Sequence, residues 1–183
     1  MTGPSDLAAL GWSPFFADQL TAEEAGLAPR RIASVHRARL SAVDGGDDDQ
    51  LKLPPHSTTG DFAVGDWVLA DPLTGMLVRR LDRRTVLKRR VGDGQIQLAG
   101  ANVDTLLIVS SCNADFNIAR LERYLALANQ SGTLPVIVLT KPDATADTSD
   151  FVRQAAALQR DLPVVILDAP DAARLPLPST SRG

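Results

Sequence analysis

The sequence predicts two structural classes in one chain: an N-terminal β-barrel of the OB type, followed by a partial parallel α/β domain. Within residues 28–99, about five short alternating segments are separated by Gly, Pro and Asp, which is typical of small closed barrels. Within residues 100–168, three nearly continuous apolar segments alternate with two helical patterns, and this order indicates a parallel sheet. We expect residues 1–27 to form a helical or irregular arm and residues 169–183 a disordered tail.

The barrel strands follow one another from residue 31. Arg31–Val43 predicts one strand, or two strands across a bend, and the Gly- and Asp-rich run Asp44–Asp49 indicates a turn. Trp67 is interpreted as a core residue rather than an exposed stacking aromatic, because apolar residues follow it in its strand. The remaining predicted strands are Leu51–Leu53, Val64–Ala70, Met76–Leu81 and Thr85–Arg89.

The α/β elements begin at Asp104–Ser110, an apolar run expected of a strand buried on both faces. Asn117 precedes a helical pattern that Gly132 ends, and a second helix is expected within Asp150–Arg160. The other strands are Leu134–Leu139 and Pro163–Leu167. Ligands bind beyond the carboxyl ends of such strands, so the loops at 111–116, 140–143 and 168–171 are candidate sites.

Composition suits a globular protein of one or two small domains, with 183 residues, 44% hydrophobic and 22% charged. No apolar run approaches the ~20 residues of a membrane span, and the N-terminus lacks a secretory pattern, so we expect a cytoplasmic monomer with no membrane partner. The single Cys112 excludes an intrachain disulfide. With only two histidines, His36 and His56, no metal site is expected.

Charge is distributed unevenly. The net charge is −4 over residues 1–27, +3 over 28–100 and −2 over 101–183. One positive face on the barrel would suit the phosphates of RNA, while solvated strand faces with paired surface charges would explain the same counts. The residues alone favour neither reading. The candidate RNA-contacting residues are Arg30, Arg31, Arg37, Arg39, Arg83, Arg84, Arg89 and Arg90.

Thr140-Lys141-Pro142-Asp143 follows the second apolar strand and matches the [Asn/Thr]-Lys-x-Asp pattern that selects guanine. One carboxylate, here that of Asp143, can accept hydrogen bonds from both N1–H and the exocyclic amine of guanine, a pair that adenine lacks. The alternative is an ordinary strand-to-helix turn in which Asp143 is solvated. No Gly in this chain precedes a Lys, so the Gly-x-x-x-x-Gly-Lys-[Ser/Thr] phosphate cradle is absent.

In combination, these motifs resemble the circularly permuted GTPases that depend on the small ribosomal subunit, a ribosome-maturation family. The resemblance implies an OB barrel that contacts ribosomal RNA, a permuted GTPase domain that binds GTP or GDP, and a zinc-binding domain. The segments that carry it are Leu10-Gly11-Trp12, Arg31–Arg37, Val64-Gly65-Asp66-Trp67-Val68, Arg83–Leu87, Ala101–Asp104, Asn113–Asn117, Arg120–Leu125 and Thr140–Asp143.

The sequence departs from that family after the third strand, where Asp168-Ala169 stands in place of Ser-Ala. The cradle, the magnesium-binding switches and the zinc domain are missing, so Mg and Zn are implied only for parts beyond this sequence. We expect the N-terminal part of such a GTPase, without catalytic residues and without GTP hydrolysis of its own. A free-standing RNA-binding module with a vestigial nucleotide domain is the alternative. An unrelated α/β enzyme is a third reading, but Cys112 has no histidine in its domain to act as a base.

Overall fold

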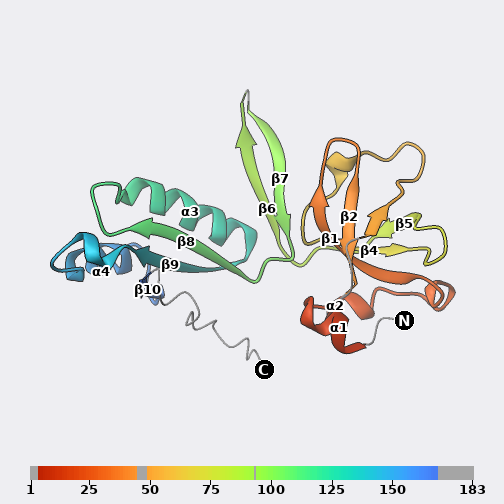
Figure 1. The fold of residues 1–183 in the computed structure, drawn as a ribbon, viewed down its shortest axis with the longest axis horizontal. Coiled ribbons are helices and arrows are strands. Elements are labelled where there is room, and N and C mark those ends of the chain that lie inside the picture. Colours follow the sequence, from red (N-terminus) through yellow and green to blue (C-terminus); the bar gives the residue numbers. More distant parts are fainter. Residues whose placement is uncertain (1–3, 45–48, 93, 169–183) are drawn as a thin grey trace. The chain divides into compact units, whose positions relative to one another are not determined.

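The structure is a computed structural model that describes residues 4–44, 49–92 and 94–168. The chain forms two compact units, residues 1–103 and residues 104–183 (Figure 1). The predicted tail at 169–183 and most of the predicted acidic turn lie outside the described residues. No helix among those described is long and apolar enough to cross a membrane.

The N-terminal arm contains the short helices α1 (Pro4–Ala9) and α2 (Pro14–Ala17) and the 3-10 turn η1 (Ala22–Glu24). It packs on Trp67, which is 1% exposed and therefore a core residue, as predicted. The Trp12 ring meets Trp67 edge-on with 4.8 Å between centroids, and Phe16 joins the same cluster. Aromatic burial of this kind contributes more to stability than most other contacts, so the arm is part of the first unit's core.

The main sheet of the first unit has five antiparallel strands in the order β3-β2-β1-β4-β5. The predicted segment at 31–43 forms two strands, with a turn at residues 36–39 between them. The sheet is curled, which is consistent with a barrel, and its core contains Ile32, Leu40 and Val68. The strands are β1 (Ala28–Val35), β2 (Leu40–Val43), β3 (Asp49–Leu51), β4 (Trp67–Ala70) and β5 (Leu77–Arg80), and a 3-10 turn η2 (Thr59–Asp61) precedes β4.

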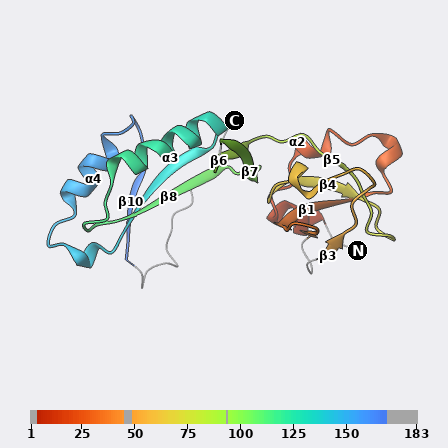
Figure 2. The same cartoon turned by 90° about the horizontal axis from the view of Figure 1, so that it is seen from above.

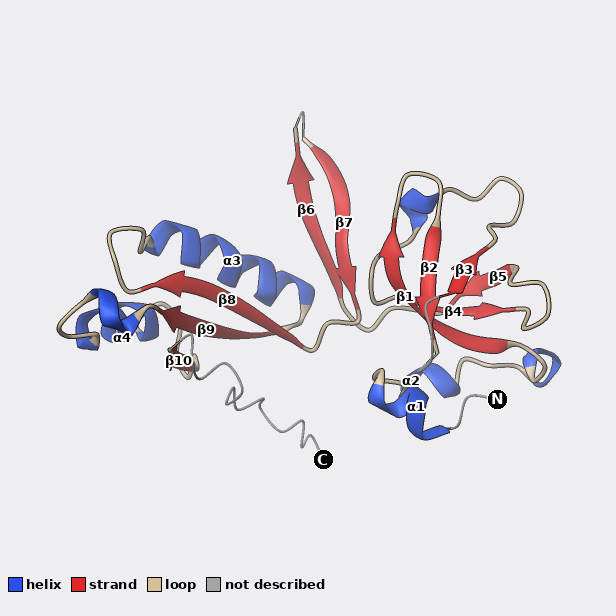
Figure 3. Cartoon of the chain, in the orientation of Figure 1, coloured by secondary structure: helices blue, strands red, loops and turns tan. Residues whose placement is uncertain are grey.

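Two further strands, β6 (Val86–Val91) and β7 (Gln95–Ala101), pair as an antiparallel hairpin. They form a two-stranded sheet of their own, which Figure 3 shows as a separate ribbon. The sequence predicts β6 but not β7. The hairpin has few buried residues along its length, so β7 lacks the alternation that marks a half-buried strand.

The second unit is a parallel sheet in the order β10-β9-β8, with helix α3 running along β8 and β9 (Figures 1 and 2). Asn117 caps α3 by accepting from Arg120 N at 2.9 Å, and Gly132 ends it at φ 72°, which confirms both predicted boundaries. The elements are β8 (Thr105–Ser111), α3 (Ile118–Ser131), β9 (Leu134–Thr140), the 3-10 turn η3 (Pro142–Ala144), α4 (Ser149–Ala156) and β10 (Val164–Leu167).

The two helices share one hydrophobic core with this sheet. Ile108 of β8 packs there with residues of β9, α3 and α4. On the opposite face of β8, Leu107 is 39% exposed and Val109 is 60% exposed. The prediction that this strand is buried on both faces is therefore wrong, because the described helices pack with the Ile108 side of the strand.

Candidate functional site

Gly65 lies where two segments of the first unit approach closely. Its φ is 91°, and a Cβ at this position would lie 2.1 Å from the carbonyl oxygen of Ala101. Only glycine fits both the backbone conformation and the space. The Val-Gly-Asp-Trp segment therefore requires glycine at this position, because its backbone packs directly against the end of β7.

Asp66, the next residue, is fully buried and forms an ion pair with Arg83. Arg83 donates from Nε at 2.6 Å and from Nη2 at 2.7 Å, and the Ala63 amide donates to the same carboxylate at 2.8 Å. The Arg83 side chain is only 12% exposed. This arginine, expected on an RNA face, is held by an ion pair inside the first unit.

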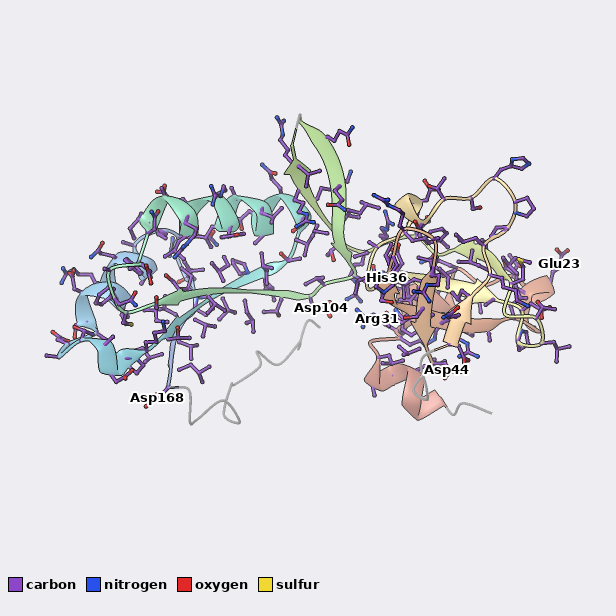
Figure 4. The ribbon with its side chains drawn as sticks, turned by 45° about the horizontal axis from the view of Figure 1, so that its top comes forward. Glu23, Arg31, His36, Asp44, Asp104 and Asp168 are labelled. Carbon is purple, nitrogen blue, oxygen red and sulfur yellow. The ribbon has the colours of Figure 1, made fainter. Side chains whose placement is uncertain are left out.

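Arg30 and Arg31 also have partners within the first unit. Arg30 Nη1 lies 2.8 Å from Asp44 and 3.1 Å from Asp49. The sequence places these acids in a turn apart from the bases, but the strand pairing brings them against β1. Arg31, labelled with Asp44 in Figure 4, donates to the carbonyls of Leu10 and Asn102, the latter at 3.1 Å.

The other five candidate arginines are exposed. The β1–β2 turn, closed by His36 N donating to the Arg39 carbonyl at 2.9 Å, carries two of them. The Arg84 guanidinium lies 5.8 Å from the centre of the Phe15 ring. The last two, Arg89 and Arg90, lie on strand β6 of the β6–β7 hairpin. The exposed five are Arg37, Arg39, Arg84, Arg89 and Arg90, so the eight candidates divide into three partly buried arginines and five exposed ones.

Two sets of long-range side-chain hydrogen bonds in the first unit were not predicted from the sequence. Asn102, at φ 55°, donates from Nδ2 to the Gly65 carbonyl at 3.0 Å and accepts from the Arg84 amide at 2.8 Å. Glu24 accepts from Arg79 at 2.6 and 2.8 Å. Hydrogen bonding from that guanidinium lowers the pKa of Glu24 to about 2. Nothing local signals a pair that is separated by 55 residues.

The candidate guanine loop lies at the carboxyl end of β9. Thr140 Oγ1 donates to the Ser110 carbonyl at 3.1 Å, which ties the loop to the neighbouring strand β8. Lys141 has φ 55° and ψ 52°, a left-handed conformation that costs a residue with a Cβ about 1 kcal/mol. Pro142 begins the turn η3, and the Asp143 side chain is exposed. Strain of this kind concentrates at ligand loops.

The carboxyl ends of β8, β9 and β10 lie at one edge of the sheet because the three strands are parallel. After β8, Asn113 Oδ1 accepts from Ser111 Oγ at 2.8 Å and from the Asp115 amide at 2.9 Å. After β10, the exposed Asp168 is labelled in Figure 4, and residues 169–171 lie outside the described residues. Within the described ranges, no group of three His, Cys, Asp or Glu side chains is placed to hold a metal ion.

Comparison with solved structures agrees with this architecture. YjeQ from Thermotoga maritima matches with a TM-score of 0.59 at 21% identity, over 79% of this chain and 53% of that chain. YloQ, described as a circularly permuted GTPase, matches with a TM-score of 0.58 at 20% identity, over 82% and 55%. At these identities the likeness shows a shared fold.

Sequence comparison is more specific. The RsgA GTPase family model matches residues 80–176. The small ribosomal subunit biogenesis GTPase RsgA of Mesorhizobium japonicum is 62% identical over 163 residues, covering 88% of this chain and 47% of that protein. RsgA 2 of Vibrio vulnificus is 37% identical over 171 residues, covering 92% and 48%. The chain spans about half the length of these relatives, and it belongs to the RsgA GTPase family.

Proposed function

We propose that this chain is the N-terminal part of a ribosome-maturation GTPase that acts as a monomer in the cytoplasm. Its first unit, an OB-type barrel, binds RNA of the small ribosomal subunit, and the Thr140–Asp143 loop selects guanine nucleotides. Family membership supports the general role, since the matched relatives are named for small ribosomal subunit biogenesis. The residue assignments rest on the geometry of the two sites.

The observation that carries RNA binding is the exposed β1–β2 turn. Arg37 and Arg39 are exposed there, while Arg30, Arg31 and Arg83 are bound to partners of their own chain. An exposed arginine can bind a phosphate without first breaking a buried interaction, and its guanidinium suits bidentate phosphate contacts. We therefore place the phosphate contacts of the barrel at the exposed arginines rather than at all eight candidates.

The test is fluorescence anisotropy of a labelled small-subunit RNA fragment over a series of salt concentrations. Replacing Arg37 and Arg39 by Ala should weaken binding and reduce the log–log salt slope by about 0.9 per lost contact. The fold should be unaffected, because exposed strand-end charges contribute little stability. Arg123→Ala/Arg160→Ala, which removes two exposed charges from the second unit, is the matched control. Equal affinity and slope in wild type and the turn variant would place the RNA contacts elsewhere.

Guanine selection is supported by the strained Lys141 and the exposed Asp143 at the carboxyl edge of the sheet. The Asp143 carboxylate fits the two adjacent N–H donors of guanine. With no Gly-Lys cradle for the phosphates, we expect a Kd no tighter than roughly 100 μM. The chain alone should show no GTP turnover above a protein-free blank.

Titration with GDP and ADP measures this selectivity. Wild type should respond more strongly to GDP, and Asp143→Ala should lose that preference. Asp161→Ala, which removes a carboxylate that is 90% exposed outside the loop, should keep it. An equal response of wild type to both nucleotides contradicts the guanine role of the loop, and it leaves the RNA proposal untouched.

A further inference from the structure

The β1–β2 turn, residues 36–39, carries two exposed arginines, Arg37 and Arg39. His36 N donates to the Arg39 carbonyl at 2.9 Å, which closes the base of the turn. Surface loops are among the most mobile parts of a fold unless further contacts hold them. The direction in which Arg37 points therefore depends on what holds the tip of this turn.

The 3-10 turn η2 supplies such a contact from 22 residues away in the sequence. Thr59 Oγ1 donates to the Arg37 carbonyl at 3.2 Å, and the Thr59 side chain is half-buried. Figure 3 shows η2 as the short helix beside the upper end of β1. This bond fixes the planar peptide unit that follows Arg37, so it restricts the backbone of the residue that presents the guanidinium.

η2 is itself held at three points, so it can act as a rigid support. Asp61 Oδ2 accepts from Thr58 N at 3.1 Å and from Thr58 Oγ1 at 3.0 Å, which closes a capping box. Arg83 Nη2 donates to the Asp61 carbonyl at 3.0 Å, while the same guanidinium pairs with the buried Asp66. Phe62, the residue after η2, is 7% exposed and belongs to the hydrophobic core of the main sheet. The buried ion pair is thus connected to the β1–β2 turn through η2.

We propose that Thr59 is a positioning residue for RNA binding by the β1–β2 turn. Its hydroxyl holds the Arg37 carbonyl, and with it the backbone that presents Arg37 and Arg39, in the arrangement that binds RNA phosphates. A loop that is ordered before binding avoids the cost of ordering it in the complex. This inference rests on the proposed RNA-binding function and adds to it a residue that does not itself touch the RNA.

The test compares Thr59→Val, which removes the hydroxyl at nearly constant volume, with Thr59→Ser, which keeps it. Fluorescence anisotropy of the labelled small-subunit RNA fragment is measured with the whole chain over a series of salt concentrations. Thr59→Val should bind about five- to tenfold more weakly, which corresponds to the cost of ordering the backbone of one residue. Its log–log salt slope should equal that of wild type, because no charge is removed. Thr59→Ser should bind as wild type does.

Thr145→Val is the matched control, because Thr145 Oγ1 also donates to a backbone carbonyl, that of Asp147 at 3.0 Å, but in the second unit. This variant should leave the RNA affinity unchanged. In the free protein, ¹⁵N relaxation should show larger backbone motion at residues 37–39 in Thr59→Val than in wild type, and Thr59→Ser should restore the wild-type values. Unchanged relaxation in Thr59→Val would show that the hydroxyl does not hold the turn.

The outcomes separate this inference from the function on which it rests. If Arg37→Ala/Arg39→Ala weakens binding while Thr59→Val binds as tightly as wild type, Thr59 is not a positioning residue and the RNA-binding function stands. A salt slope that falls in Thr59→Val, or a Thr59→Ser variant as weak as Thr59→Val, also overturns the positioning role. A wild type that binds no RNA overturns the RNA-binding function and this inference with it.

Discussion

Replacing Arg83 by methionine, with Asp66 left in place, should severely destabilise the first unit. Asp66 is fully buried and accepts three hydrogen bonds, two of them from Arg83 at 2.6 and 2.7 Å. The variant leaves the carboxylate with only the Ala63 amide at 2.8 Å. Methionine covers similar apolar area, so the main loss is compensation of the buried charge rather than packing.

Removing one partner of a buried ion pair costs about 3–5 kcal/mol. Small domains have total unfolding free energies of about 5–15 kcal/mol, so this loss is a large fraction of the whole. The exposed pair Arg153–Asp150 gives a matched control in the second unit, and Arg153→Met should change the unfolding free energy of that unit, followed by circular dichroism at 222 nm, by less than about 0.5 kcal/mol. The double variant Asp66→Leu/Arg83→Met should recover most of the loss, because neither charge then remains buried.

Urea unfolding followed by tryptophan fluorescence reads the first unit directly. The chain has two tryptophans, Trp12 and Trp67, and they contact each other within that unit. The midpoint should fall for Arg83→Met with an unchanged urea slope, which marks a change in stability rather than in the unfolded state. A loss below about 1 kcal/mol would refute the claim that Arg83 is a structural residue and return it to the candidate RNA contacts.

Three further outcomes follow from local geometry. Gly65→Ala should cost more than about 2 kcal/mol by the same fluorescence assay, because its Cβ would meet the Ala101 carbonyl, whereas Gly26→Ala has open space and should be nearly neutral. The Glu24 pKa lies at about 2, below its ordinary value of 4.5, because the carboxylate accepts hydrogen bonds from Arg79. This interaction therefore stabilises the arm fully above pH 4.5, and the stabilisation is lost as the pH falls toward 2. Acid titration of tryptophan fluorescence should show this loss in wild type beyond that in Glu24→Gln, and identical curves would contradict it. Lys141→Gly should stabilise the second unit by about 0.5–1 kcal/mol in thermal unfolding followed at 222 nm, since glycine adopts φ 55° without steric cost, and a net destabilisation would show that the lysine side chain supports the loop.

Local signals predicted the second unit well. The caps of α3, Asn117 and Gly132, are single residues whose side chain or backbone fixes a helix end, and both were predicted. The apolar strands were also found, because continuous runs of Val, Ile and Leu need no knowledge of their neighbours. Which faces the helices cover depends on the tertiary arrangement, so the exposure of Val109 was not predicted.

In the first unit, composition could not predict which arginines form ion pairs within the chain. Charge counting treats every arginine alike, yet Arg30 and Arg83 are held by acids that are 14 and 17 residues away in sequence, whereas Arg37 is exposed. Such pairs are created by strand register, which alternation alone does not determine. Strand β7 was missed for a related reason: a ribbon exposed on both faces has no buried side, and the period-2 signal depends on one.

The strand order of the second unit also sets an order of events during synthesis. The central strand is β9, so β8 leaves the ribosome with no partner in its own sheet until β9 follows. Translation proceeds at about 5–20 residues per second, and the 29 residues between Ser111 and Thr140 therefore take roughly 1.5–6 s. Hairpins and helices form in microseconds, so the first unit has time to fold while the apolar β8 is still unpaired. This nascent strand, Thr105–Ser111, has no charged residue, which makes it a natural binding segment for chaperones in that interval.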